Sequence, residues 1–400
     1  MKFHDTPSRS SYDVVIIGGA MMGSSAAWFL TRNPDFNGSI LVVERDPTYE
    51  FASTTHTNSC IRQQFSSALN VGISQFGASF IKTYRETYDL ADAPAIRLDA
   101  FGYLYLAGDE QKADWLRESQ AVQASLGSAT ELLTPDQIKA EFPWMNVEDI
   151  VLGSIGRRDE GYFDGASLFD FWRRDASANG AEYVQDEVAA ISRDGARASD
   201  VTLASGETVA CGTLINASGP RGALTAAMLG VDLPVEPRRR FTYIFDSAQK
   251  LSGTVPLIID PYGVHMRPEG NQFLTGCPPD PDPAMAPDDF PDEPGLFDDK
   301  LWPALYHRIP SFDQLKVTNS WVGHYAFNTL DHNAIVGPHD EIGNFILMNG
   351  FSGHGLQQSP AMGRGVSEIV AYGEYRTLDL SPLGYERIRK GEPFQELAVI

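Results

Sequence analysis

The sequence predicts an α/β fold that opens with a βαβ unit of the dinucleotide-binding type. Three observations carry this prediction: an unbroken β-branched run at 13–17, a glycine-rich turn at 18–23 before a helical stretch, and a second apolar run at 40–43 that ends in an acidic residue. The chain has 400 residues, of which 42% are hydrophobic and 21% are charged. This length and composition indicate a globular chain of two domains or one large composite domain.

The turn after the first strand reads Gly-Gly-Ala-Met-Met-Gly, which matches G-x-G-x-x-G except that Ala20 replaces the second glycine. That alanine adds only one methyl where the backbone approaches a pyrophosphate, and Gly23 allows the helix predicted at 24–30 to pack closely on the strand. Glu44 ends the second strand, where its carboxylate can accept hydrogen bonds from both ribose hydroxyls and would repel a 2′-phosphate. The unit therefore predicts a dinucleotide other than NADP, and by itself it does not distinguish FAD from NAD.

The charge balance of the chain disfavours some classes of binding partner. With 31 basic and 53 acidic residues the formal net charge is −22, which disfavours nucleic acid and anionic lipid as partners. A small anionic substrate remains possible, because a buried pocket can carry its own cation. The three cysteines are scattered without a CxxC pair, the histidine spacing predicts no metal site, and the polar N-terminus lacks a signal peptide. We therefore expect a soluble cytoplasmic protein with no membrane span.

The rest of the chain favours a flavin. A polar loop at 53–65 carries one His and one Arg, and an Ala-Ser-Gly turn within 201–210 predicts a hairpin. Buried strands are predicted at 213–216 and 345–348, each ending in small or polar residues. A helix is predicted at 359–372, and its N-terminal amides favour an anion such as the edge of a reduced flavin.

Four further motifs accompany the glycine turn: STTHTNSCIRQQFS in the polar loop, NASGP after the strand at 213–216, DHNAIVGP near the C-terminus, and then GFSGHGLQQSPAMGRG. Together they resemble the D-amino-acid oxidase/glycine oxidase (DAO) superfamily of FAD enzymes. They are most similar to the branch that holds sarcosine oxidase, dimethylglycine dehydrogenase and the FAD-dependent oxidoreductase-domain proteins. The resemblance covers nearly the whole chain, with the motifs in the family's order.

The resemblance implies a composite α/β (α+β) architecture with FAD as the cofactor. A discontinuous, Rossmann-like FAD-binding domain would combine residues 1–90, 150–225 and 325–400. A substrate domain with an antiparallel sheet would combine residues 91–149 and 226–324.

The resemblance also assigns cofactor contacts. The pyrophosphate would be held by Gly18, Ala20, Met22 and Gly23, the ribose by Glu44, and the adenine by the backbone of Val188. The path toward the flavin would be lined by Arg45, Ser53, Thr54 and Thr55, and the isoalloxazine ring would be bordered by Gly353, His354, Gly355, Leu356 and Gln357. His56 lies where dimethylglycine dehydrogenase-like proteins link the flavin covalently, but we expect a non-covalent FAD with a covalent link at His56 as the alternative.

Three residues are the catalytic candidates. Arg62 matches the family arginine that grips a substrate carboxylate, although it could instead tie a loop to a helix. His354 and His265 are expected to face the pocket. The family lysine beside that pocket is replaced by Gln357, and the lysine that promotes reaction with oxygen is replaced by Leu274. We therefore expect a dehydrogenase that passes electrons to a protein or quinone acceptor.

The expected reaction is oxidation of a C–N bond in a secondary or N-alkylated amino acid, such as a sarcosine-, dimethylglycine- or imino-acid-like substrate. Hydride would pass to flavin N5, and the resulting imine would hydrolyse. The first alternative is a 2-hydroxy-acid dehydrogenase, which needs a histidine as general base. The second is a flavoprotein assembly scaffold with little turnover. An acidic segment at 278–300, rich in proline, is expected to be a solvated excursion or a docking patch for a basic acceptor.

Overall fold

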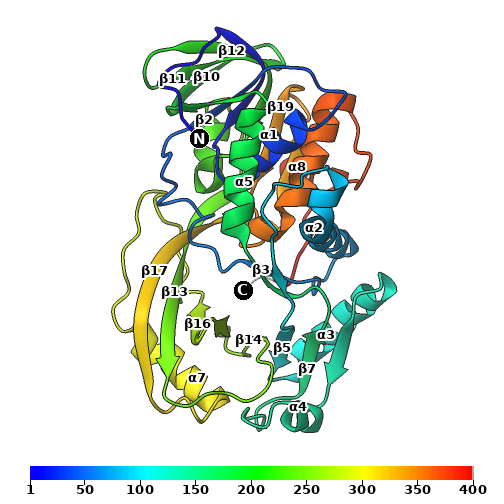
Figure 1. Cartoon of the computed structure of the whole chain (residues 1–400), viewed down its shortest axis with the longest axis vertical. Helices are drawn as coiled ribbons and strands as arrows, with labels where there is room; N and C mark the ends of the chain where they lie inside the picture. Colours follow the sequence, from blue (N-terminus) through cyan, green and yellow to red (C-terminus); the bar gives the residue numbers. More distant parts are fainter. Residues whose placement is uncertain (399–400) are drawn as a thin grey trace.

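Two large β-sheets frame the molecule in the computed structural model, which describes residues 1–398. The first sheet forms the upper body in Figure 1 and is covered by helices, and the second forms the lower body. Each sheet has eight strands, and a third, three-stranded sheet lies where the two bodies meet. The α/β class predicted from the sequence is confirmed.

The first sheet has a parallel centre, as the buried apolar runs predict. Its strands follow the order β10-β11-β12-β1-β2-β9, with β19 beside β12 and β18 beside β19. Pairing is parallel between β1 and both of its neighbours, between β2 and β9, and between β12 and β19. The strands are β1 (Ser11–Ile17), β2 (Ile40–Glu44), β9 (Ala181–Gln185), β10 (Val188–Asp194), β11 (Arg197–Leu203), β12 (Thr208–Asn216), β18 (Ile335–Pro338) and β19 (Phe345–Asn349).

One strand of this sheet is longer than predicted. The hairpin within 201–210 forms between β11 and β12, but β12 then continues through the region predicted as a separate strand. Gly212 lies at the joint, where a Cβ atom would be 2.7 Å from the carbonyl oxygen of Asp13. The glycine therefore lets β12 run unbroken along β1.

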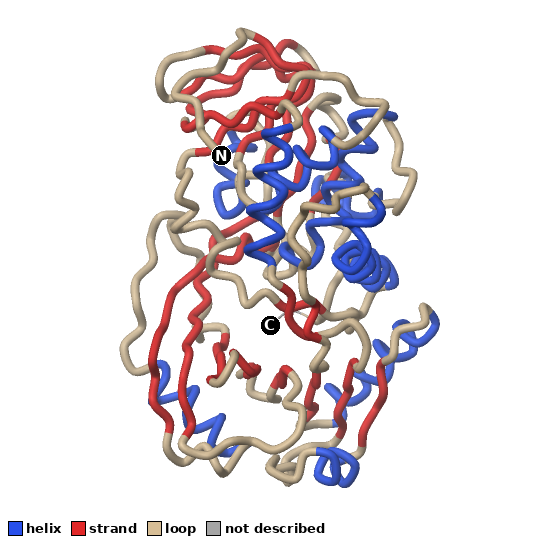
Figure 2. Tube along the Cα trace, in the orientation of Figure 1, coloured by secondary structure: helices blue, strands red, loops and turns tan. Residues whose placement is uncertain are grey.

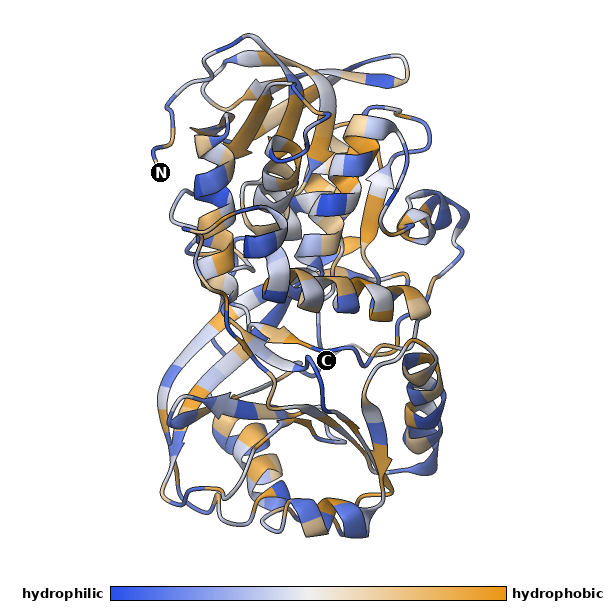
Figure 3. Ribbon diagram, turned by 45° about the vertical axis from the view of Figure 1, so that its right-hand side comes forward, coloured by the Kyte–Doolittle hydropathy of each residue, from blue (hydrophilic) through white to orange (hydrophobic). Residues whose placement is uncertain are grey.

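Helices α1 (Met21–Thr31), α5 (Gly165–Ala178) and α8 (Gly355–Tyr372) pack together on this sheet (Figures 1 and 2). The apolar strands and the inner helix faces form a core that includes Trp28, and Figure 3 shows hydrophobic residues along the strands of the upper body. Helix α8 begins at Gly355, four residues before the predicted start, and contains Pro360. Proline leaves the carbonyl of Leu356 without its amide donor, and the Ser359 hydroxyl donates to that oxygen at 2.7 Å instead.

The second sheet has the order β17-β13-β16-β15-β14-β5-β7-β6 and is antiparallel except between β14 and β5. Strand β7 falls in the segment 150–225 expected for the FAD-binding domain, yet its hydrogen bonds go to β5 and β6 of the second sheet. The strands are β5 (Tyr103–Ala107), β6 (Thr130–Leu133), β7 (Leu152–Gly156), β13 (Val235–Ser247), β14 (Leu257–Ile259), β15 (His265–Glu269), β16 (Gln272–Cys277) and β17 (Leu315–Asn328).

The remaining elements are short or peripheral. The three-stranded sheet joins β3 (Cys60–Ile61), β8 (Gly161–Phe163) and β4 (Leu98–Asp99). The other helices are α2 (Ala68–Thr87), α3 (Glu110–Ser125), α4 (Pro135–Glu141), α6 (Gly222–Ala227), α7 (Trp302–Arg308) and α9 (Glu386–Lys390), with single turns at Gly219–Arg221, Phe297–Leu301 and Ser381–Leu383. Within residues 1–398, no helix combines the length and apolar character needed to cross a membrane.

A buried ion pair holds the C-terminal part of the described chain against the first sheet. Asp331 is fully buried and accepts hydrogen bonds from Arg387 Nε at 2.7 Å and from the backbone N–H of Phe394 at 2.9 Å. Removing the carboxylate would leave the Arg387 charge buried without compensation. Asp331→Ala should therefore lower the free energy of unfolding by about 3–5 kcal/mol in a denaturant titration.

The surface pair Arg389–Asp340 provides the matched control, since both side chains are partly exposed. Asp340→Ala should cost about 1 kcal/mol or less. Equal losses in the two variants would show that the Asp331 network does not stabilise the fold in this way.

Candidate cofactor and substrate site

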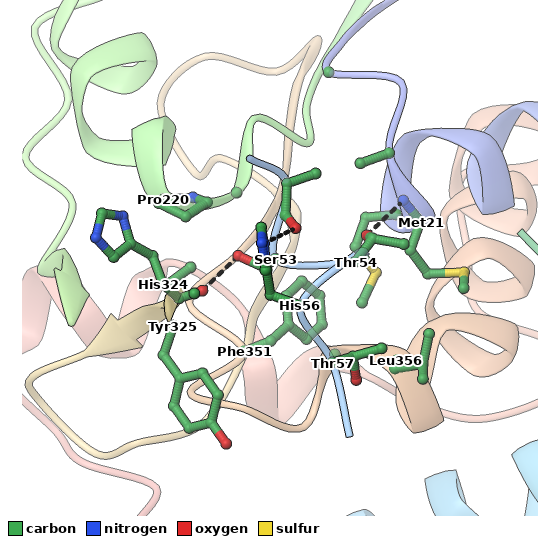
Figure 4. A pocket seen from close by; sticks show the side chains of 18 of the residues that line it. Met21, Ser53, Thr54, His56, Thr57, Pro220, His324, Tyr325, Phe351 and Leu356 are labelled. Atoms are coloured by element: carbon green, nitrogen blue, oxygen red, sulfur yellow. Dashed lines mark hydrogen bonds between the residues drawn. The ribbon is translucent and has the colours of Figure 1, made fainter. Parts of the chain in front are cut away.

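A cavity of about 350 Å³ lies between the two large sheets. Its walls come from the ends of β1 and β2, the first turns of α1 and α8, the loop between β2 and β3, and strands of the second sheet (Figure 4). Every site residue predicted from the sequence lines this cavity except Gly23 and Thr55. We call its two parts the nucleotide end, beside the first sheet, and the substrate end, beside the second sheet.

Two glycines shape the nucleotide end. Gly18 has φ +94°, and a Cβ atom there would lie 2.6 Å from the carbonyl oxygen of Ala217. At Gly23 a Cβ atom would lie 1.8 Å from the carbonyl oxygen of Gly18, so any side chain would push α1 away from the turn. Gly23 thus packs the helix on the strand behind the cavity wall, whereas Ala20 lines the cavity with an ordinary extended conformation.

The two helices that begin at the cavity lack side-chain caps. Among the described helices of ten or more residues, α2, α3 and α5 are capped by Ser67, Asp109 and Asp164. Helices α1 and α8 have Ala20 and His354 at the N-cap and no capping hydrogen bond. Except for the N–H of Met21, which donates to the Thr54 hydroxyl, their first-turn N–H groups and their dipoles remain available to an anion in the cavity. A dinucleotide pyrophosphate and the electron-rich edge of a reduced flavin are such groups, so the cavity fits FAD.

Glu44 lies at the end of β2 with both carboxylate oxygens held by backbone. One oxygen accepts from the N–H of Gly19 at 2.8 Å and the other from that of Asp46 at 2.8 Å. Burial raises the pKa of this carboxyl, while the two N–H donors act in the opposite direction. The carboxylate is thus fixed at the cavity wall, and its remaining lone pairs can accept from ribose hydroxyls.

The loop between β2 and β3 is fixed by its hydroxyl groups (Figure 4). Ser53 donates to the carbonyl of His324 at 2.5 Å, and the Thr54 hydroxyl accepts from the N–H of Met21 at 3.2 Å. The Thr55 hydroxyl donates to the carbonyl of Tyr49 at 2.6 Å and so stabilises the turn rather than facing the cavity.

His56 lines the cavity in the same loop (Figure 4). Its Nδ1 lies 3.3 Å from the carbonyl of Ala52, and its backbone carbonyl accepts from Trp321 Nε1 at 3.4 Å. Burial lowers the pKa of the imidazole, which favours the neutral form. A neutral ring is compatible with either a hydrogen bond to the flavin or a covalent link.

Arg62 lies at the substrate end and is 4% exposed. Its Nη2 contacts His354 Nε2 at 3.1 Å and also donates to the carbonyl of Ala398. The guanidinium carbon lies 4.3 Å from the ring centre of Phe65. Gln357, which replaces the family lysine, accepts from the backbone N–H of Arg62 at 2.9 Å. The backbone of Arg62 therefore joins its loop to α8, and the Nε of its side chain remains a buried donor without a partner within residues 1–398.

Two of the four histidines that line the cavity, His354 and His265, have lowered pKa values that favour the neutral form. His354 has a pKa well below its ordinary value because it is buried and lies beside Arg62. His265 has a pKa of about 4, again because of burial, with Arg267 and Arg240 adding to the effect. His354 Nε2 contacts both Arg62 Nη2, a donor, at 3.1 Å and the carbonyl oxygen of Ala398, an acceptor, at 3.2 Å, and His265 Nε2 contacts the donor Asn58 Nδ2 at 3.0 Å.

The acidic segment is bound to the protein rather than extended into solvent. Asp288 pairs with Arg45 at 2.9 Å and also with Arg221, while Asp282 pairs with Arg240 at 3.0 Å. Phe290 stacks on the ring of His324, with ring centres 4.1 Å apart. Since Asp288 and Asp282 already have arginine partners, these contacts do not favour the alternative in which the segment is a docking patch for a basic acceptor.

The sequence analysis missed Arg240 and Tyr325, which also line the substrate end. Arg240 belongs to a run of three arginines, 238–240, in a chain with a net charge of −22. Such a run within a predicted strand is a signal that could have identified it.

Comparisons with known proteins agree with this geometry. A family model described as FAD dependent oxidoreductase (DAO) matches residues 13–369. FAD-dependent oxidoreductase domain-containing protein 1 of Bos taurus is 37% identical, over 99% of this chain and 88% of that protein. Mitochondrial sarcosine dehydrogenase of Mus musculus is 21% identical, over 92% of this chain and 40% of that protein.

Solved structures share the fold. L-Proline dehydrogenase from P. horikoshii superposes with a TM-score of 0.82 at 24% identity, covering 97% of this chain and 100% of that chain. Glycine oxidase from Geobacillus kaustophilus gives a TM-score of 0.79 at 21% identity, covering 94% and 98%. The resemblance predicted from the motifs is confirmed, and the chain belongs to the DAO family of FAD-dependent oxidoreductases.

Proposed function

We propose that this oxidoreductase oxidises a C–N bond in a secondary or N-alkylated amino acid whose carboxylate binds Arg62. Similar proteins carry the names sarcosine dehydrogenase, L-proline dehydrogenase and glycine oxidase, which agrees with an amino-acid substrate. When bound, FAD would supply the acceptor for the two electrons and hydrogen that leave the carbon beside nitrogen. The nitrogen lone pair then forms the C=N bond, and water adds to the imine to release an amine and a carbonyl product.

The observation that carries this proposal is the missing partner of Arg62. Four arginines are buried in the described chain, and three of them pair with carboxylates: Arg267 with Glu269, Arg308 with Asp260, and Arg387 with Asp331. Arg62 has only the neutral groups of His354 and Ala398. A buried guanidinium stays charged, so a carboxylate from the substrate would complete it with charge-assisted hydrogen bonds.

The histidines favour an amine over a 2-hydroxy acid. Oxidation of an alcohol needs a general base, and the best base has a pKa near the working pH. His265 has a pKa of about 4, and its Nε2 lone pair is used by Asn58. His354 has a pKa well below its ordinary value, and its Nε2 already contacts Arg62 and the carbonyl of Ala398. A neutral amine needs no such base, because its own lone pair assists the departure of hydride.

The residues that line the cavity support a specific set of contacts with the cofactor. We infer that Ala20 and Met22 at the start of α1 hold the pyrophosphate, that Glu44 holds the ribose, and that Val188 meets the adenine. The residues bordering the flavin ring would be Gly353, His354, Gly355, Leu356 and Gln357. Arg45, Ser53 and Thr54 line the path between these groups, and His56 contacts the flavin non-covalently.

The lining of the cavity supports a dehydrogenase. No lysine is among the described residues that line it, and Leu274 lies outside the wall. Lys300, the last residue of the acidic segment, does not line the cavity, and its Nζ donates to the carbonyl of Pro278 at 3.0 Å. Without a lysine in this lining to stabilise charge that develops on oxygen, reaction with O2 should be slow, and a protein or quinone would take the electrons.

The proposed function is tested by anaerobic reduction of the purified flavoprotein with N-alkyl amino acids, cyclic imino acids, D-amino acids and 2-hydroxy acids. We expect N-alkyl or imino acids to bleach the flavin and admitted air to restore its colour slowly. Acid precipitation should release free FAD into the supernatant. Bleaching by 2-hydroxy acids alone would contradict C–N oxidation, and yellow precipitated protein would show a covalent flavin.

Loss of the Arg62 charge should weaken the binding of acidic substrates selectively. Replacing Arg62 with Gln removes charge-assisted hydrogen bonds, so the reductive Kd for an N-alkyl amino acid should rise about 10- to 100-fold. The amide of the same substrate serves as the control, since it has no carboxylate to lose. Equal losses for acid and amide in stopped-flow reduction would show that Arg62 only supports the loop.

The pH profile should follow the substrate rather than the enzyme. Burial lowers the pKa of all four histidines that line the cavity, so they stay neutral as the pH rises and the rate of flavin reduction divided by Kd should rise with the neutral fraction of the amine. Substrates with lower amine pKa should shift the profile by the same amount. Burial raises the pKa of Glu160, which accepts from the backbone N–H of Gln63, to about 7, so this carboxyl could titrate in the same pH range. Glu160→Gln removes that titration and is the control, and the pH profile should keep its dependence on the substrate. A profile that is identical for all substrates would indicate an enzymatic base.

A further inference from the structure

We propose that Arg240 is a second carboxylate anchor, and that the substrate is therefore a secondary amine bearing an acidic group on each of two arms, an N-(carboxyalkyl) amino acid. This inference rests on the proposed function, because Arg62 would hold the first carboxylate. It names a specificity-determining residue and the class of substrate that this residue selects.

The charge of the cavity wall is the first line of support. The acidic residues that line the cavity are Glu44, Asp46, Asp186, Glu187 and Asp288. Four of them follow β2 and β9 at the nucleotide end, and Asp288 is paired there with Arg45. The strands of the second sheet add Arg240 and His265 to the lining but no carboxylate. In a chain with a net charge of −22, a substrate end with two guanidinium groups and no described acidic lining is selective for anions.

Tyr325 links the surroundings of the two arginines, and all three residues line the cavity. Arg240 lies on β13 opposite Gly323 of β17, and its guanidinium carbon is 4.7 Å from the ring centre of Tyr325. The same ring abuts Gly353, where a Cβ atom would lie 2.4 Å from it. The next residue, His354, contacts Arg62 at 3.1 Å. Both guanidinium charges act on the Tyr325 hydroxyl, although burial outweighs them and raises its pKa.

Arg240 already binds a carboxylate in the geometry that a substrate would use. Its Nη1 and Nη2 donate to the two oxygens of Asp282 at 3.0 Å each. The Asp282 side chain is 25% exposed and belongs to the acidic segment, which has separate attachments through Asp288 and Phe290. Asp282 can therefore yield its place to a substrate carboxylate while the segment stays bound. The exchange replaces one bidentate pair with another and leaves no buried charge unpaired.

A matched pair of substrates isolates the second carboxylate. N-(Carboxymethyl)glycine and N-(carbamoylmethyl)glycine have nearly the same size, but only the first carries two carboxylates. Longer N-(carboxyalkyl)glycines and their amides test the length of the second arm. For each compound, stopped-flow anaerobic reduction gives the rate constant and the Kd, and perturbation of the flavin spectrum reports binding even without reduction.

Substitutions at Arg240 and Asp282 should have opposite effects. We expect the wild-type protein to prefer the best diacid over its amide by about 10-fold or more in Kd. Arg240→Gln should abolish this preference and Arg240→Lys should retain part of it. Asp282→Asn removes the competing carboxylate and should lower the Kd of the diacid, although it breaks the same ion pair as Arg240→Gln.

The outcomes separate the inference from the proposed function. If Arg240→Gln and Asp282→Asn weaken diacid and amide equally, the pair only fastens the acidic segment and the inference is wrong. If wild-type protein reduces monocarboxylate amines as well as it reduces diacids, Arg240 does not select the substrate. If diacids perturb the flavin spectrum in an Arg240-dependent way but no amine bleaches it, the anchor stands and C–N oxidation fails.

Discussion

The buried charge of Arg62 is the constraint around which the centre of the molecule is built. A guanidinium cannot lose its proton in a protein, and burying it costs several kcal/mol unless other groups compensate. Here the compensation is incomplete: the ring of Phe65, the carbonyl of Ala398 and a neutral His354 surround it. Glu396 places Ala398 by accepting from the N–H of that residue at 3.0 Å. Only uncharged groups contact the guanidinium directly among the described residues, while the buried carboxyls of Glu160 and Glu396 act on it without a hydrogen bond.

The two ends of the cavity use different parts of the chain. At the nucleotide end, backbone groups form the surface, because α1 begins there without a cap and Gly18 and Gly23 bring strand, turn and helix together. Ala20 can stand where the fingerprint has glycine because its φ of −70° suits any residue, whereas Gly18 and Gly23 leave no room for a side chain. At the substrate end, side chains form the surface: Arg62 follows β3, and the others project from the second sheet. Substitutions there change charge directly and so should alter specificity more than cofactor binding.

Two acidic residues of the segment at 278–300 are tied to arginines that line the cavity. Asp288 binds Arg45 and Arg221 beside the first sheet, and Asp282 binds Arg240 on the second sheet. The acidic segment therefore spans the two bodies beside the cavity. These ion pairs compensate acidic side chains beside the cavity, so a strongly negative chain can still present positive side chains inside it.

The sequence by itself determined the α/β class, the βαβ unit and the family, because these depend on local patterns: apolar runs, a glycine turn and short motifs in order. Most of the site residues that it identified line the cavity, since most of them belong to the motifs themselves. Only the tertiary structure assigned β7 to the second sheet and joined β12 into one strand, because strand partners and close backbone contacts are made by distant residues. It likewise showed that Arg62 lacks a carboxylate and that Arg240 shares its cavity. Those facts depend on which side chains come into contact after folding. Arg62 contacts His354 and Arg240 contacts Asp282, and the residues of each pair lie far apart in the sequence.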